Sequence, residues 1–119
     1  MPEKPFETGD VVWSPDPYHK DDPELAGTPT PRPWLILSTA KYPSQGGDYI
    51  ACALTSNTRS DENAIPLAPK DWTKGNPPKP SQIDPQTIMT LKHHWAKRYL
   101  GRIADAKVNL ARNRLKSYL

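Results

Sequence analysis

Short apolar runs bounded by turn-forming residues dominate the first three quarters of the chain. A run at 11–13 (VVW) lies between the turn signals GD and SP, and longer runs occupy 34–39 (WLILST) and 49–54 (YIACAL). Runs of this length, rich in β-branched and aromatic residues, are typical of β-strands. The connection at 41–48 contains two consecutive glycines, which predicts a hairpin with a longer loop between the second and third strands.

Weaker β signals follow further along the chain. A fourth strand is predicted at 64–68, where Pro66 favours an edge position because proline cannot donate to a strand ladder. Residues 82–83 and 87–91 predict further β segments. The stretch 69–80 (PKDWTKGNPPKP), which lies between the fourth strand and these segments, predicts a loop. The total is about five short strands.

The period of the apolar residues changes after residue 92. Apolar positions then recur at spacings of three and four, which indicates an amphipathic helix whose inner face holds Val108, Ala111, Leu115 and Tyr118 or Leu119. Asp105 is the predicted N-cap, and residues 93–98 predict a short helical turn. The fold class is therefore mainly β with a C-terminal helix. We expect one domain over 1–119, a small barrel closed against the helix, because closure removes exposed sheet edges.

Proline is concentrated in two stretches. The chain has 15 prolines, mostly between residues 15 and 33 and between residues 66 and 85. Proline lacks an N–H and fixes φ, so these stretches are predicted to be extended loops rather than interior strands or helices.

Charge is divided unevenly along the chain. Residues 1–91 hold eight Lys/Arg and twelve Asp/Glu, a net of −4, and residues 92–119 hold eight Lys/Arg and one Asp, a net of +7. A basic C-terminal quarter on an acidic body indicates an anionic partner, either a nucleic acid or an acidic protein segment. A merely solvated helix face remains the alternative. The cations concerned include Lys97, Arg98, Arg102, Arg112, Arg114 and Lys116.

Several classes of function have no sequence support. The single cysteine, Cys52, lies in an apolar run and is predicted to be core, and the adjacent His93 and His94 have no third ligand nearby, so we expect no metal and no cofactor. The N-terminus lacks the apolar centre of a signal peptide, and no stretch approaches about 18 apolar residues, so we expect a cytoplasmic protein without a membrane partner.

Five short motifs occur in order along nearly the whole chain. They are GDVVW at 9–13, RPWLILS at 32–38, ACALTSN at 51–57, SQID at 81–84 and LGRI at 100–103. Taken together, they resemble the MazF/PemK/Kid family of toxin endoribonucleases. The resemblance implies an SH3-like β-barrel, usually a homodimer, that cleaves single-stranded RNA without a metal and is neutralised by an acidic antitoxin protein.

The resemblance also implies a set of site residues. Arg32 of the RP pair and Thr55 of the TS pair form the core of the site, and His19 and Asp84 are further catalytic candidates. The predicted RNA-binding residues are Ser56, Trp72, Lys74 and Gln82. The sequence departs from the family in a long acidic loop at 18–31 and in Gln82, where some relatives have arginine.

The residue types suit the chemistry that the resemblance implies. Metal-free RNA cleavage uses the 2′-hydroxyl of the RNA as nucleophile, so the protein needs only proton transfer and stabilisation of charge on the phosphate. Arg32 can donate two hydrogen bonds to phosphate oxygens, and Thr55 can hold the phosphate or the 2′-hydroxyl. The alternative is a non-catalytic SH3-like barrel, as in an inactive or gyrase-poisoning relative or an adaptor that binds protein segments.

Overall fold

Strands form most of the part of the chain that the computed structural model describes, which is residues 6–15, 31–39, 48–55, 63–75, 81–96 and 98–119. Within these residues there are seven strands, two 3-10 helices and one α-helix. Their bounds are β1 Asp10–Pro15, β2 Pro31–Ile36, β3 Tyr49–Thr55, β4 Ile65–Leu67, η2 Pro69–Asp71, β5 Trp72–Lys74, β6 Ser81–Leu91, η3 His93–Trp95, β7 Arg98–Ile103 and α1 Asp105–Ser117.

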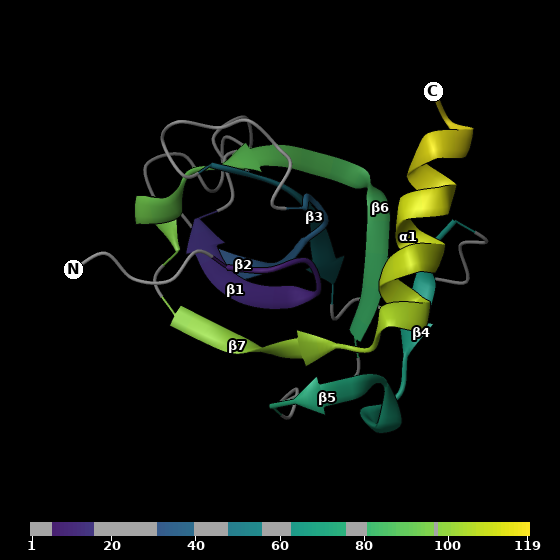
Figure 1. Ribbon diagram of the computed structural model, residues 1–119, viewed down its shortest axis with the longest axis horizontal. Coiled ribbons are helices and arrows are strands. Elements are labelled where there is room, and N and C mark those ends of the chain that lie inside the picture. The colour runs from purple at the N-terminus through teal and green to yellow at the C-terminus, as the bar shows by residue number, and fades with distance from the viewer. Residues whose placement is uncertain (1–5, 16–30, 40–47, 56–62, 76–80, 97) are drawn as a thin grey trace, which may run out of the picture.

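The strands build one antiparallel sheet that curls into a nearly closed barrel (Figure 1). Their order is β4-β6-β3-β2-β1-β7-β5, and α1 stands against β6. The predicted mainly-β barrel with a C-terminal helix is confirmed. The two predicted segments at 82–83 and 87–91 are one strand, β6, with a bulge opposite Cys52 and Ala53.

The predicted loop at 69–80 is wrong over its first half. Residues 69–71 form η2 and residues 72–74 form β5, which pairs with β7 at the sheet edge. The two backbones lie so close that a Cβ on Gly101 would overlap the Lys74 carbonyl oxygen. This strand depends on a glycine far away in sequence, so no local pattern could reveal it.

The expectation that the proline-rich stretches avoid strands is also wrong in part. Pro31 and Pro33 lie in β2, Pro66 in β4 and Pro85 in β6. Each lies at an end, an edge or an irregularity of the strand ladders. The β2–β3 ladder begins only at Trp34, β4 is an edge strand, and Pro85 lies in the β6 bulge.

Strands β1, β2 and β3 are buried on both faces, and successive residues alternate between two apolar clusters. One cluster also packs against α1. It consists of Val11, Leu35, Leu37, Cys52, Leu54, Ile65, Leu67, Ile83, Ile103, Val108 and Ala111. The other, which we call the Trp34 cluster, consists of Val12, Trp34, Ile36, Tyr49, Ala51, Ala53 and Leu91. Burial of Cys52 confirms its assignment to the core.

Helix α1 packs through Val108 and Ala111, with Leu115 partly buried beside them. Its N-cap is Ala104 rather than the predicted Asp105, because Ala104 has a non-helical ψ of 143° and its carbonyl accepts the first intrahelical bond, from the Val108 N–H at 3.2 Å. Tyr118 and Leu119 are exposed rather than on the inner face. No helix in the part of the chain that the structure describes is long and apolar enough to cross a membrane.

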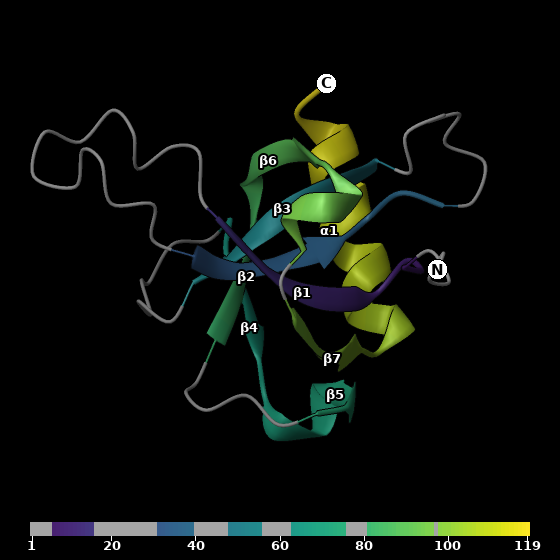
Figure 2. The ribbon, with the colours of Figure 1, turned by 90° about the vertical axis from the view of Figure 1, so that its left-hand side faces the viewer.

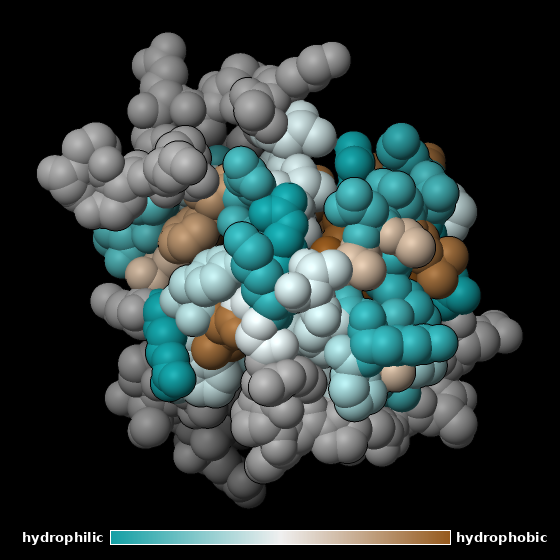
Figure 3. All heavy atoms as spheres, turned by 60° about the horizontal axis from the view of Figure 1, so that its bottom comes forward, coloured by the Kyte–Doolittle hydropathy of each residue, from teal (hydrophilic) through white to brown (hydrophobic). Residues whose placement is uncertain are grey.

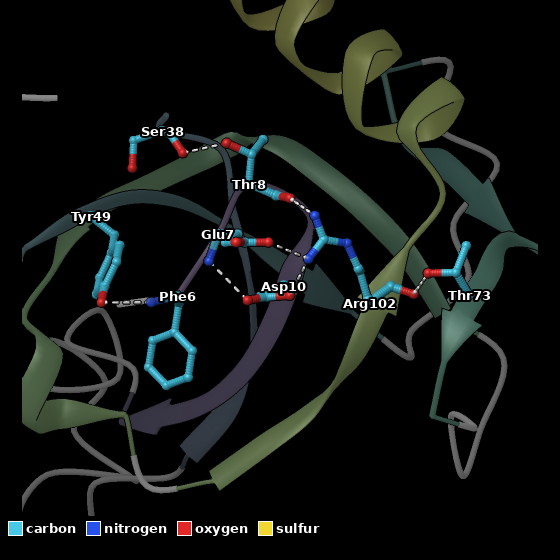
Figure 4. Close-up of polar contacts among 8 residues, drawn as sticks. All are labelled: Phe6, Glu7, Thr8, Asp10, Ser38, Tyr49, Thr73 and Arg102. Atoms are coloured by element: carbon cyan, nitrogen blue, oxygen red, sulfur yellow. Dashed lines mark hydrogen bonds and ion pairs between the residues drawn. The ribbon is translucent and has the colours of Figure 1, made fainter. Parts of the chain in front are cut away.

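A group of polar contacts ties the segment before β1 to β7 (Figure 4). Arg102 donates from Nη1 to Glu7 Oε2 at 3.0 Å and to Asp10 Oδ1 at 3.1 Å, and from Nη2 to the Thr8 carbonyl at 3.1 Å. Asp10 Oδ2 in turn accepts the Glu7 N–H at 2.8 Å. We call this set the Arg102 clasp. It holds the segment before β1, and Asp10 at the start of β1, against β7.

Candidate functional site

The register of the central strands places three predicted site residues in one row. Trp34 pairs with Ala53, so Arg32 lies beside Thr55 when this register is continued by two residues, and Thr55 pairs with Gln82 on β6. Side chains two residues apart on a strand lie on the same face of the sheet. Arg32, Thr55 and Gln82 therefore form a row across β2, β3 and β6.

A fourth predicted residue lies one step away on the same face. Asp84 pairs with Ala53 in the adjacent row. Its Oδ1 accepts the Gln86 N–H at 3.2 Å, and its Oδ2 accepts the Thr87 hydroxyl at 2.8 Å. These contacts hold the carboxylate at the β6 bulge, and bulges often aim a side chain next to an active site.

The Arg32 side chain is half-buried, and contacts with the Leu54 carbonyl and with Trp34 hold its head group. Its Nε and Nη2 donate to the Leu54 carbonyl at 3.3 and 3.0 Å. Its Cζ lies 5.9 Å from the ring centroid of Trp34, within the range of a cation–π interaction. The guanidinium is therefore oriented before any ligand arrives.

Sequence reasoning missed Ser14, which extends the row onto β1. Ser14 pairs with Arg32 and is fully buried, and its hydroxyl has a long hydrogen bond of 3.4 Å to the Pro15 carbonyl. The signal was a polar residue two places after the buried Val12, and therefore on the same face. In Figure 2 the end of β1 and the start of β2 lie side by side at the left.

Comparison with known proteins bears on what this row does. A family model described as "PemK-like, MazF-like toxin of type II toxin-antitoxin system" matches residues 7–119. The chain belongs to this toxin family. The resemblance drawn from the five motifs is thereby confirmed. The comparison with curated proteins found no match.

Solved structures agree with the family in fold. An endoribonuclease in complex with its cognate antitoxin, from a mycobacterial species, has a TM-score of 0.70 at 22% identity and covers 94% of this chain and 92% of its own. MazF from Deinococcus radiodurans has a TM-score of 0.72 at 19% identity and covers 98% of this chain and 97% of its own. MazE–MazF from the same organism has a TM-score of 0.69 at 18% identity, with coverage of 98% and 96%.

Two other residues predicted for this toxin lie on a different part of the barrel. Trp72 and Lys74 are on β5, which pairs with β7 rather than with the strands of the row. The Trp72 ring packs against the apolar cluster beside α1, and its indole N–H is buried without a hydrogen-bond partner among the described residues. Lys74 is exposed. His19 and Ser56 lie outside the described residues.

The basic C-terminal quarter of the toxin is partly neutralised inside the molecule. Arg102 is paired in the clasp, and its hydrogen bond with Glu7 raises the pKa of its guanidinium above the usual value. Lys107 lies 3.9 Å from the buried Asp71. The basic surface available to a partner is therefore smaller than the charge count indicates. No group of three potential metal ligands occurs within the described ranges.

Proposed function

We propose that this toxin is an endoribonuclease that cleaves single-stranded RNA through the RNA's own 2′-hydroxyl, without a metal. The observation that supports this most directly is the row of Arg32, Thr55 and Gln82, with Asp84 beside it, in a chain of the PemK/MazF-like toxin family. The mycobacterial structure of the same fold is described as an endoribonuclease. A cation, a hydroxyl and a carboxylate on one face are the groups that this reaction needs.

In the proposed reaction, the 2′-oxygen attacks the adjacent phosphorus and the bond from phosphorus to the 5′-oxygen breaks. The 2′-hydroxyl proton goes to a base, for which we propose Asp84, and the leaving 5′-oxygen takes a proton from an acid, for which we propose His19. Arg32 stabilises the negative charge that develops on the phosphate oxygens, and Thr55 holds the phosphate or the 2′-hydroxyl by a hydrogen bond. The products are a 2′,3′-cyclic phosphate and a 5′-hydroxyl.

The remaining predicted residues would contact the RNA outside the scissile phosphate. Gln82 adjoins Thr55 in the row, and Ser56 follows Thr55 in sequence, so both are proposed to contact the neighbouring nucleotides. A more distant part of the RNA strand would be bound by Trp72 through base stacking and by Lys74 through its charge. The Trp72 ring packs against the core and is only partly exposed, so any stacking would be limited to the part of the ring that solvent reaches.

We further propose a cytoplasmic homodimer that is neutralised by an acidic antitoxin protein. The Deinococcus radiodurans MazE–MazF structure holds MazF, which has this fold, together with MazE. The net charge of +7 over residues 92–119 favours an acidic segment, even with Arg102 and Lys107 paired inside the molecule. In the view of Figure 3 the coloured surface is mostly hydrophilic, with hydrophobic residues in small separate groups. We propose that the subunits meet through apolar barrel surface; sedimentation velocity would measure the dimer directly.

The experiment is cleavage of a single-stranded RNA in excess EDTA, with end-group analysis of the products. We expect a 2′,3′-cyclic phosphate or its opened form, and cleavage that appears only on adding divalent ions would contradict the mechanism. Arg32→Ala and Thr55→Val should each lower the rate by about 10²–10³. The matched control is Lys70→Ala, which removes an exposed cation on η2. A folded protein that binds RNA or antitoxin but never cleaves would favour the non-catalytic alternative.

A further inference from the structure

Along β2 and β3, residue pairs that are hydrogen-bonded alternate with pairs that are not, and this alternation identifies the β2 residue that should bond to the Leu54 carbonyl. The Leu37 N–H donates to the Ile50 carbonyl at 2.8 Å, so the residues of β2 that point their backbone groups toward β3 are 37, 35 and 33. The register pairs Leu35 with Cys52, and one further step places residue 33 opposite Leu54. In a regular ladder, residue 33 would therefore donate its N–H to the Leu54 carbonyl.

Residue 33 is proline and has no N–H to donate. The ladder between β2 and β3 stops at Trp34 and Ala53, one step before this position. Two donors from the Arg32 side chain, Nε and Nη2, bond to the Leu54 carbonyl instead, at 3.3 and 3.0 Å. Pro33 thus leaves the Leu54 carbonyl of β3 without a backbone donor from β2, and the Arg32 side chain donates to this carbonyl instead.

The second support for the guanidinium comes from Trp34. This residue lies two positions after Arg32 on the same face of β2, is fully buried, and has its ring 5.9 Å from Arg32 Cζ. Its indole N–H is buried without a hydrogen-bond partner among the described residues. An aliphatic side chain would fill this position without burying an unpaired N–H, so apolar packing alone does not account for a tryptophan here.

We infer that Pro33 and Trp34 are positioning residues that hold the Arg32 guanidinium in its working orientation. This inference rests on the proposed function, because it assigns these two residues to the arginine that stabilises the phosphate. The Trp34 ring lies within cation–π range of the guanidinium. The Leu54 carbonyl, which Pro33 leaves without a β2 backbone donor, holds the head group through Nε and Nη2. Neither residue is required to contact the RNA.

The test compares Trp34→Leu, Trp34→Phe and Pro33→Ala in metal-free RNA cleavage. Trp34→Leu removes the π face, so kcat should fall about threefold to thirtyfold while KM changes by less than about twofold. Trp34→Phe keeps a π face and should recover most of the loss. Pro33→Ala restores a backbone N–H that competes with Arg32 for the Leu54 carbonyl, and kcat should fall by a factor of about 2–10.

Leu91→Ala is the matched control, because Leu91 is fully buried in the Trp34 cluster but lies at the far end of β6 from Gln82. It should lower the melting temperature without lowering kcat per folded molecule. An equal loss of kcat in Leu91→Ala and Trp34→Leu would overturn the inference, since general loosening of the core would then explain both. Unchanged kcat in both folded Trp34→Leu and Pro33→Ala would overturn it as well.

An NMR measurement separates this inference from the proposed function. The Arg32 Nε–H, bonded to the Leu54 carbonyl, should give a signal with slow hydrogen exchange in the wild type, and Pro33→Ala should weaken its protection. This readout needs no RNA cleavage. If the wild type does not cleave RNA, the proposed function fails while the Arg32 signal still tests the positioning. If the Arg32 signal is identical in wild type and in the folded Pro33→Ala and Trp34→Leu variants, the positioning fails.

Discussion

Replacing Arg102 tests whether a cation of the basic C-terminal quarter serves the fold rather than a partner. In Arg102→Met the aliphatic part of the side chain is kept, but the hydrogen bonds to Glu7, Asp10 and the Thr8 carbonyl are lost. Because Asp10 is only 7% exposed, its carboxylate would then remain buried without its cation. We expect the variant to fold with lower stability and to keep RNA cleavage per folded molecule.

The expected loss of unfolding free energy follows from how deeply each partner of Arg102 is buried. A charged hydrogen bond to a buried group contributes about 1.5–3 kcal/mol, so the Asp10 contact dominates. The Glu7 side chain is 71% exposed, and an ion pair of this kind contributes up to about 1 kcal/mol. The total cost of Arg102→Met is therefore about 3 kcal/mol of unfolding free energy. In a domain of this size, that loss corresponds to about 10 °C in melting temperature.

Urea unfolding followed by tryptophan fluorescence would measure the effect. Glu7→Gln is the control, and because its side chain is exposed it should cost no more than about 0.5 kcal/mol. A double-mutant cycle between Arg102→Met and Asp10→Asn should give a coupling energy of about 1–2 kcal/mol. If Arg102→Met costs no more than Glu7→Gln, or if the cycle shows no coupling, the clasp does not hold β1 to β7 as argued.

Three further predictions test other parts of the molecule. Gly101→Ala would overlap the Lys74 carbonyl and sit at a φ of +154°, so we expect a loss of about 2 kcal/mol or more in thermal unfolding; an unchanged melting temperature would contradict the close β5–β7 packing. Burial raises the pKa of the Cys52 thiol, which therefore stays protonated at pH 8 and should react with a thiol reagent only after unfolding. Rapid reaction of the folded protein would show that Cys52 is accessible. Reversing Arg112 and Arg114 to Glu should weaken antitoxin binding, measured by titration, more than RNA cleavage; intact antitoxin affinity with lost cleavage would place α1 at the RNA instead.

The main elements of the fold could be predicted because their signal is local. The apolar runs at 11–13, 34–39 and 49–54 became β1, β2 and β3, and the three-and-four spacing after residue 105 became α1. Burial of a continuous apolar run requires only that some partner cover it, so the run is visible without knowledge of the partner. The bounds were less predictable. β2 starts at Pro31 because it pairs with Pro15 of β1, and that pairing is not a local property.

The candidate site divides in the same way. Motifs nominated Arg32, Thr55, Gln82 and Asp84, but only the register of β2, β3 and β6 places them in adjacent rows on one face. Ser14 joins the row through a pairing that no motif describes. The Leu54 carbonyl that orients the Arg32 guanidinium belongs to the backbone, which has the same chemistry at every position. A sequence pattern therefore cannot identify the Leu54 carbonyl as part of the site.

The charged residues show most clearly which properties the sequence alone could not determine. The sequence by itself determined that the last quarter of the chain carries a net charge of +7, and it determined the continuous apolar runs that are buried on both faces of the central strands. Only the tertiary structure decided that Arg102 forms ion pairs with Glu7 and Asp10, and that β5 packs closely against Gly101. The physical reason is common to both. Periodic burial is encoded by neighbours along the chain, whereas ion pairs and backbone contacts between distant strands exist only once the register is set.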